Sequence, residues 1–322
     1  MNKPAKHILI QNYHPTASLA LVRDFQRIGF KVYCPDSDWD RISYAGGCNA
    51  DLGGELISQH DYFSLEPGFV LIPCKFQEDD LREIADEHGD ELILNIAQHG
   101  QYYELGISEI MICPDIITFD MYPAAMRHKL LYFPRPNLGR EFKKNVSYAF
   151  RRKAVRSFIS IPHVWVHGYA AYHEFKARYP HDCRLHGFEA PDGYLKHLHC
   201  NAVMADAFFT AHFKDDESYG FSCVESMMLG TPICSLKKFM RDKTLGRFFL
   251  DESNAIVADT VDEVIERMQL LSFDQYSEMS TNARKRVLDL TSDQNTILRL
   301  KAALADEYPG LFADLPMGAI SE

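Results

Sequence analysis

Short apolar runs alternate along the first half of the chain with longer amphipathic stretches. The apolar runs have the length and composition of buried strands, and the stretches between them repeat apolar positions every three to four residues, as helices do. Strands are predicted at residues 7–11, 31–34, 69–73 and 91–97, and helices at residues 18–28 and 78–87. This order predicts a parallel sheet covered by helices on both faces.

A second series with the same alternation starts near Arg156. Its predicted strands are residues 157–161, 183–187, 207–213 and 232–236, and its predicted helices are 168–179, 195–205 and 221–229. With 322 residues, the chain is long enough for two domains, which we expect at 1–150 and 151–322. Residues 36–66 are rich in Gly, Asp, Ser and aromatics, and are predicted to be long loops that either hold a ligand or only connect strands.

The most informative segment runs from Glu217 to Pro232 and reads ESYGFSCVESMMLGTP. Glu217 falls in a strand-to-helix loop and Glu225 about two turns into the helix. Gly220 lets a ligand approach the main chain, and the amides of a helix start favour an anion such as phosphate. Ionised carboxylates accept strong hydrogen bonds from sugar hydroxyls, so the segment suggests a nucleotide sugar. The alternative is an amphipathic helix whose two glutamates face solvent.

This arrangement resembles the E-x7-E motif of retaining glycosyltransferases with the GT-B fold, above all group 1 (family 4), whose usual form is E-G-F-G-x-P-x-x-E-A-M-x-x-G-x-P. Ser218, Ser222 and Ser226 depart from that form, and the matching positions are Glu217, Tyr219, Gly220, Glu225, Met227, Gly230 and Pro232. The resemblance implies an α/β protein of two Rossmann-like lobes with parallel sheets facing across a cleft. The first lobe would be on the acceptor side and the second would bind the nucleotide sugar, with the last helix packing back on the first lobe.

The resemblance also implies roles. Glu225 would hold the donor ribose, Glu217 the transferred sugar, and the amides of Gly220, Phe221 and Ser222 the distal phosphate. The donor would be a nucleoside diphosphate sugar, most simply a UDP-sugar, with no further cofactor. No metal is expected, because no D-x-D motif follows a strand.

Two features concern histidines. Relatives carry G-R-L-x-x-K-G after the first strand of the second lobe, whereas this chain reads P-H-V-W-V-H-G, with His163 and His167 at the Arg and Lys positions. A protonated imidazole can donate to phosphate, so these histidines either bind the diphosphate or fill the loop, and Arg152 or Lys153 nearby would take over the contact. His99, at the end of a predicted strand, is the candidate that faces the transferred sugar, and the alternative is a local hydrogen bond.

The charge is unevenly distributed. The chain has 34 basic and 45 acidic residues, a formal charge of −11, yet residues 127–156 hold ten Lys or Arg and one acid. Residues Phe142, Val146, Ala149 and Phe150 fall on one helical face, which predicts a basic amphipathic helix. Its partner would be DNA or another polyanion, or an anionic membrane surface. The alternative is a solvated helix docked by its apolar stripe.

For the acceptor we favour a hydroxymethylated pyrimidine in DNA, as modified by phage glycosyltransferases. The alternatives are a lipid-linked or surface polysaccharide, or a non-catalytic protein that binds sugar nucleotides or polyanions. Neither a signal peptide nor an apolar run long enough to span a membrane is recognisable, so the expected location is the cytoplasm, that of the host if a phage encodes the protein. The eight cysteines form no C-x-x-C pair, so no zinc site is expected. Nothing in the sequence indicates an oligomeric state.

Overall fold

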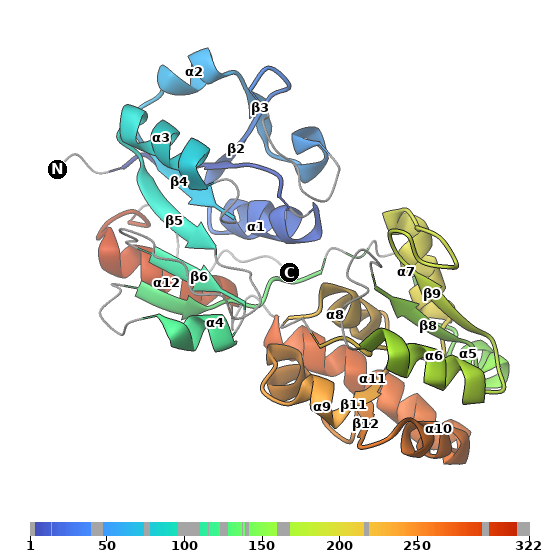
Figure 1. Ribbon diagram of the computed structural model, residues 1–322. Coiled ribbons are helices and arrows are strands. Elements are labelled where there is room, and N and C mark those ends of the chain that lie inside the picture. Colours follow the sequence, from blue (N-terminus) through green and yellow to red (C-terminus); the bar gives the residue numbers. More distant parts are fainter. Residues whose placement is uncertain are drawn as a thin grey trace. The chain divides into compact units, whose positions relative to one another are not determined.

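The computed structural model divides the chain into two units, residues 1–137 with 291–322, and residues 138–290. It describes residues 4–13, 15–39, 48–73, 78–95, 110–114, 116–122, 128–136, 138, 142–159, 168–215, 219–291 and 296–313. The first unit therefore ends at Asn137 rather than at residue 150, and it takes up the last segment of the chain (Figure 1). The boundary lies earlier than expected because the helix before residue 155 packs on the second unit.

The first unit is built on a seven-stranded sheet of order β3-β2-β1-β4-β5-β6-β7, in which every pair of neighbours is parallel. The strands are β1 His7–Ile10, β2 Lys31–Pro35, β3 Glu55–Ile57, β4 Phe69–Ile72, β5 Glu91–Asn95, β6 Ile110–Cys113 and β7 His128–Leu131. The helices are α1 Pro15–Arg27, the 3-10 turn η1 Asn49–Leu52, α2 Gln59–Phe63, α3 Glu78–His88, α4 Ile116–Met121 and α12 Leu298–Glu307. The loops expected at 36–66 thus contain η1, the edge strand β3 and α2.

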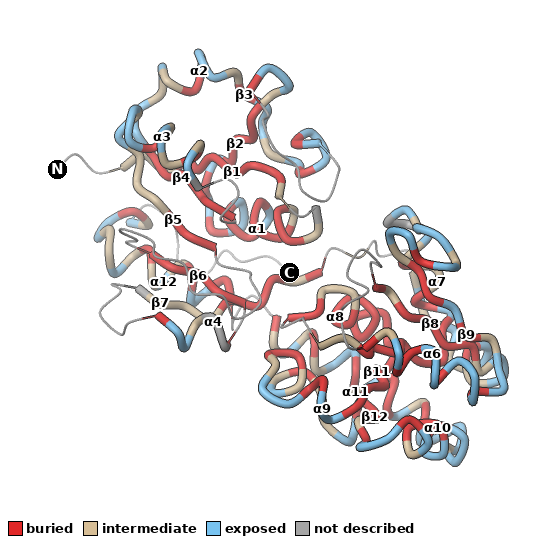
Figure 2. The backbone as a smooth tube through the Cα atoms, in the orientation of Figure 1, coloured by how far each residue is buried: buried red, intermediate tan, exposed pale blue. Residues whose placement is uncertain are grey.

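Alternate residues of the central strands pack into two separate hydrophobic cores, one on each face of the sheet. Ile8 and Ile10 of β1 pack with α1 and with α12, whereas Leu9 packs on the opposite face with residues of α2 and α3. This period of two is what a sheet covered on both faces requires, and Figure 2 shows β1 and β4 buried along their length. Leu300 and Leu304 of α12 are fully buried in the first of these cores.

The second unit contains a five-stranded sheet of order β12-β11-β10-β8-β9, also parallel throughout. Its strands are β8 Val155–Phe158, β9 Cys183–His186, β10 Phe209–Ala211, β11 Ile233–Leu236 and β12 Ala255–Ala258. Its helices are α5 Val146–Arg152, α6 Gly168–Arg178, α7 His197–Asp206, α8 Phe221–Met228, α9 Lys237–Met240, the π-helical turn η4 Leu245–Phe249, α10 Val261–Leu270 and α11 Phe273–Leu290.

The basic helix expected within residues 127–156 is short in the structure, where α5 spans only Val146–Arg152. Asn145 caps α5 by accepting a hydrogen bond from the Tyr148 amide, and Lys153 ends the helix in a left-handed conformation with φ 55°. Phe142, Lys143 and Lys144 precede the helix, so only seven residues are helical. A seven-residue helix cannot present the long basic face that the sequence predicted.

The start of α6 approaches the segment that follows β10 at Gly168, the first residue of α6. A Cβ atom at this position would lie 1.5 Å from the carbonyl oxygen of Phe213, two residues past the end of β10. Only glycine allows the start of α6 to touch the backbone that follows β10. Close packing of the backbone therefore explains why the P-H-V-W-V-H-G segment ends in a glycine.

The position of α12 leads to the first prediction. Truncating Leu300 to alanine should destabilise the first unit by about 3 kcal/mol, because the side chain is fully buried and leaves a cavity. Hydrogen exchange should report lost protection in β1 and β4 and unchanged protection in β10 and β11. Leu298→Ala is the control, since that side chain is 40% exposed. Equal effects of the two variants would contradict the packing of α12 described above.

The close approach at Gly168 gives a second prediction. Gly168→Ala should lower the free energy of unfolding by about 3 kcal/mol or more, because the added methyl group forces backbone to move. Gly193→Ala adds the same methyl group in open space at φ +79°, and should cost only about 1 kcal/mol of left-handed strain. Urea unfolding of both variants measures the difference, and the interpretation fails if Gly168→Ala costs no more than its control.

Candidate functional site

The candidate site begins where the chain passes from β10 into α8. Gly220 precedes the helix with φ 67° and ψ 63°, a left-handed conformation that favours glycine. Its carbonyl oxygen accepts the amides of Cys223 at 2.9 Å and Val224 at 3.0 Å. The amides of Phe221 and Ser222 come before these in the first turn, where helix geometry provides no intrahelical acceptor. The start of α8 is thus suited to an anion.

Aromatic packing fixes this helix start in place. Tyr219 is buried, and its ring meets the rings of Phe221 and Phe249 edge-on, with centroids 4.9 Å and 5.5 Å apart. A Cβ atom at Gly220 would come within 3.1 Å of a methyl carbon of Leu245. The aromatic and the glycine of the motif therefore anchor α8 against η4, which is a structural role.

Glu225 lies one turn further along α8, on a helix that is buried from Cys223 to Met228. Only 7% of this residue is exposed. The next residue, Ser226, accepts a hydrogen bond of 2.8 Å from the Thr210 hydroxyl, which holds α8 against β10. An ordinary amphipathic helix would place its glutamate in water, so the burial of Glu225 argues against that alternative.

The neighbour of Glu225 on α7 is Cys200. Burial raises the pKa of the Cys200 thiol to about 12, and the negative charge of Glu225 raises it further. The thiol is therefore neutral at physiological pH and unreactive as a nucleophile. The pair shows that the Glu225 carboxylate lies in a region of low dielectric between α7 and α8, where hydrogen bonds to a carboxylate are strong.

Several predicted site residues lie outside the described part of the chain. These are Glu217, His99, His163 and His167. The structure gives positions for Glu225, Gly220, Phe221 and Ser222 of the predicted set, all of them on or next to α8, and for Arg152 and Lys153.

The structure does not bring Arg152 and Lys153 to α8. Both precede β8 and lie at the amino end of the sheet, whereas α8 begins beyond its carboxyl end. Arg152 pairs with Asp182 at 3.5 Å, and the Lys153 ammonium lies 3.9 Å and 4.1 Å from the ring centroids of Phe150 and Phe208. Because a residue that precedes a strand lies at the amino end of that strand, sequence proximity to β8 does not bring Arg152 and Lys153 to the edge where α8 starts.

Other basic residues of 127–156 are also engaged within the protein. Arg156 is buried and pairs with Asp182 at 2.7 Å, and Lys129 lies over the ring of Phe119. Lys144 places its ammonium among backbone carbonyls of the second unit. Lys143 and Arg151 are exposed. The surface charge of this stretch is therefore smaller than its composition suggests.

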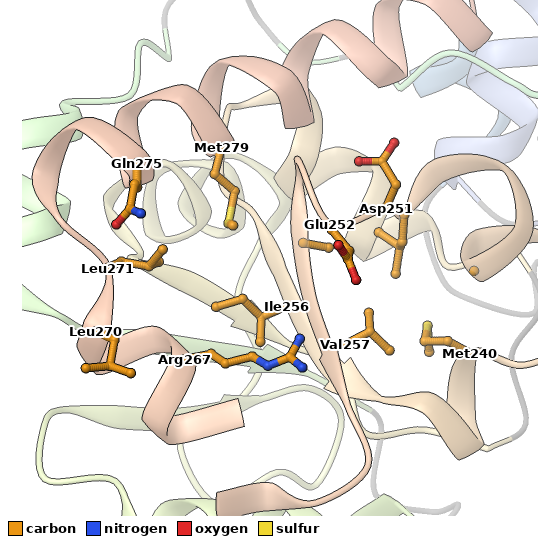
Figure 3. A pocket seen from close by; sticks show the side chains of 13 residues that line it. Met240, Asp251, Glu252, Ile256, Val257, Arg267, Leu270, Leu271, Gln275 and Met279 are labelled. Carbon is orange, nitrogen blue, oxygen red and sulfur yellow. The ribbon is translucent and has the colours of Figure 1, made fainter. Parts of the chain in front are cut away.

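A hollow of about 600 Å³ lies elsewhere in the second unit, where β12 begins (Figure 3). Ile256, Met279 and Leu271 form its apolar wall, and the side chain of Arg267 extends along it. None of the predicted site residues lines this hollow. Its lining residues include none from α8 and not Gly220.

Two kinds of site are not found in the described part of the chain. No group of three or more His, Cys, Asp or Glu there is placed to hold a metal ion. No described helix has both the length and the apolar character that crossing a bilayer requires.

Comparison with known proteins places this arrangement among known folds. No family model and no curated protein matches the sequence. The structure is similar to that of Anabaena HepE in complex with UDP and glucose, with a TM-score of 0.68 over 96% of this chain and 100% of that one at 9% identity. It is also similar to sucrose-phosphate synthase from Thermosynechococcus elongatus, with a TM-score of 0.63 over 96% and 100% at 11% identity.

A third similar structure is the DNA-modifying enzyme β-glucosyltransferase, with a TM-score of 0.56 over 94% of this chain and 98% of that one at 11% identity. Similarity at such low identity establishes the fold alone. The α/β architecture of two parallel sheets predicted from the sequence is confirmed, and the chain has the GT-B fold.

Proposed function

We propose that this protein is a glycosyltransferase that uses a nucleoside diphosphate sugar and binds this donor at the start of α8. The observation that carries the proposal is the buried carboxylate of Glu225 behind a left-handed glycine and a helix start, at the carboxyl edge of a parallel sheet. Ligands of open α/β sheets bind at that edge. The GT-B neighbours support it, since HepE was also crystallised with UDP-glucose.

In the proposed mechanism, Glu225 accepts hydrogen bonds from the ribose hydroxyls of a UDP-sugar. The amides of Gly220, Phe221 and Ser222 donate to the distal phosphate and stabilise the charge that develops as the diphosphate leaves. Glu217 contacts the transferred sugar, His99 faces it, and His163 and His167 donate to the diphosphate. These four roles rest on the sequence motif and its resemblance alone.

The bond between the anomeric carbon and the diphosphate oxygen breaks, and the acceptor oxygen bonds to the same face of that carbon, so the configuration is retained. The acceptor proton passes to the departing phosphate. No metal takes part in this scheme, because the helix start and the histidines supply the positive electrostatic potential.

The proposed acceptor is a hydroxymethylated pyrimidine in DNA. The similarity to a DNA-modifying β-glucosyltransferase supports it, and so do the exposed Lys143 and Arg151. A saccharide acceptor is the second candidate, because most other described basic groups of 127–156 are engaged internally and a lipopolysaccharide outer core galactosyltransferase has a similar fold, with a TM-score of 0.58 at 8% identity. Mass spectrometry after incubation with UDP-sugars and both acceptor types tests activity and acceptor together, and a protein that binds donor without turnover would be non-catalytic.

The role of Glu225 can be tested by an isosteric change. Glu225→Gln should weaken UDP binding by roughly tenfold to a hundredfold, because a buried charge-assisted acceptor for the ribose is lost. Glu217→Gln should instead lower turnover. Calorimetric titration and initial rates measure the two effects, with Glu278→Gln on the exposed side of α11 as the control. Full binding and turnover in both motif variants would show that Glu225 and Glu217 have no role in the proposed function.

The acceptor is tested through the exposed basic residues. If they contact a DNA backbone, Lys143→Glu with Arg151→Glu should weaken DNA binding and reduce the log-log salt slope by about 0.9 for each lost phosphate contact. The double variant Arg267→Glu and Lys285→Glu changes the net charge equally at exposed positions on α10 and α11. Identical salt slopes for parent and first variant, or no DNA binding by the parent at low salt, would favour the saccharide acceptor.

A further inference from the structure

Lys144 is a buried cation in the segment that leads into the second unit, six residues after the boundary at Leu138. Its ammonium donates to the carbonyl oxygens of Ala205 at 3.3 Å and Ala207 at 2.5 Å, and to the hydroxyl oxygen of Thr231 at 2.8 Å. That hydroxyl in turn donates to the Met204 carbonyl at 2.7 Å. An ammonium has three donors, and all three are used.

The acceptors lie at the carboxyl end of α7 and in the turn that follows α8, the helix that carries Glu225. Ala205 is in the last turn of α7 and Ala207 follows that helix, so the ammonium lies at a helix C-terminus, where positive charge is favourable. Thr231 lies in the turn between α8 and β11. Since α7 carries Cys200 and α8 carries Glu225, one cation connects both helices of the candidate site.

The surroundings of Lys144 leave little freedom. A Cβ atom at Gly230 would lie 3.4 Å from its Cδ atom, and the ring centroid of Tyr276 on α11 lies 5.9 Å from its Nζ atom. The Tyr276 hydroxyl donates to the Phe208 carbonyl at 2.8 Å. A smaller or uncharged side chain at position 144 would leave buried carbonyls without a donor, which is costly.

Protonation of Lys144 is sensitive to its environment. Burial lowers its pKa to about 7, and Asp206 at the end of α7 acts in the opposite direction. The elements packed around it carry further titratable groups, among them Cys200 on α7, Glu225 on α8 and Tyr276 on α11. Burial raises the pKa of Tyr276 well above its usual value, so that it stays neutral. The turn from Leu229 to Pro232 contributes no titratable side chain. Deprotonation of the Lys144 ammonium leaves two donors for its three acceptors.

We propose that Lys144 is a positioning residue of the donor site, and that its three hydrogen bonds hold α7 and α8 in the arrangement that places Glu225 for the donor nucleotide. The proposal rests on the proposed donor site at α8. It assigns an internal role to a lysine that the sequence grouped with a polyanion-binding surface. It also makes donor affinity dependent on pH through a group that never touches the donor.

The test compares Lys144→Met, which keeps the length of the side chain, with Lys285→Met, which removes an exposed charge on α11. At pH 6 Lys144→Met should bind UDP roughly tenfold more weakly than the parent, as expected for the loss of charge-assisted hydrogen bonds. At pH 8.5 the ratio of the two dissociation constants should be smaller than at pH 6, because the neutral amine of the parent then keeps only two of its three donors and has lost its charge. The histidines are common to both proteins and cancel in this ratio. Lys285→Met should match the parent at both pH values.

Hydrogen exchange supplies a measurement that does not depend on the donor. Protection factors at residues 204–210 and 229–234 should fall in Lys144→Met at pH 6, and in the parent between pH 6 and 8.5, which keeps the test valid if the variant folds poorly. Unchanged protection in both comparisons overturns the proposal, and so does a UDP ratio that stays at one at both pH values. If the parent binds no nucleotide, the proposed function fails, while the exchange data still show whether Lys144 holds the two helices.

Discussion

Parallel strand pairing is the constraint on which the rest of this structure depends. Every described strand pair in both sheets is parallel, so a crossover must connect one strand to the next. Within each sheet, the helices that follow the strands therefore start at the edge formed by the carboxyl ends of the strands. In the second unit this brings the starts of α6 and α8 to the ends of the neighbouring strands β8 and β10. The close contact at Gly168 and the left-handed turn at Gly220 follow from packing two helix starts at that edge. The motif is informative because its residues meet these backbone requirements.

Much of the fold could be predicted because its signals are local. The strands β1, β4 and β11 are short apolar runs, and α8 follows a strand after a glycine, so spacing alone located them within one or two residues. The segment 36–66 shows where this fails. β3 is only three residues long and lies at the sheet edge, with Glu55 and Leu56 exposed. This strand forms because it pairs with β2, and local composition does not encode such a contact with another part of the chain.

The site was predictable in part for the same reason. Gly220 and Glu225 fulfil requirements of one turn and one helix, which a sixteen-residue motif contains. Whether a described basic residue between 127 and 156 is exposed or engaged within the protein depends instead on partners far away in sequence. Arg152 and Arg156 meet Asp182, Lys153 meets Phe208, and Lys144 meets Thr231. Charge density along a sequence records how many cations are present, but not how many of them face water.

The inclusion of α12 in the first unit has a consequence for how the chain acquires its structure. During synthesis the residues of β1 to β7 emerge long before Leu300 and Leu304, which complete the core around Ile8 and Phe69. The second unit is contiguous, so it has all its strands before the first unit has its last helix. The amino-terminal sheet must therefore wait on the ribosome with one apolar face incompletely covered. This order of assembly leaves apolar surface of the first unit uncovered for longer than that of the second, and such surface favours aggregation.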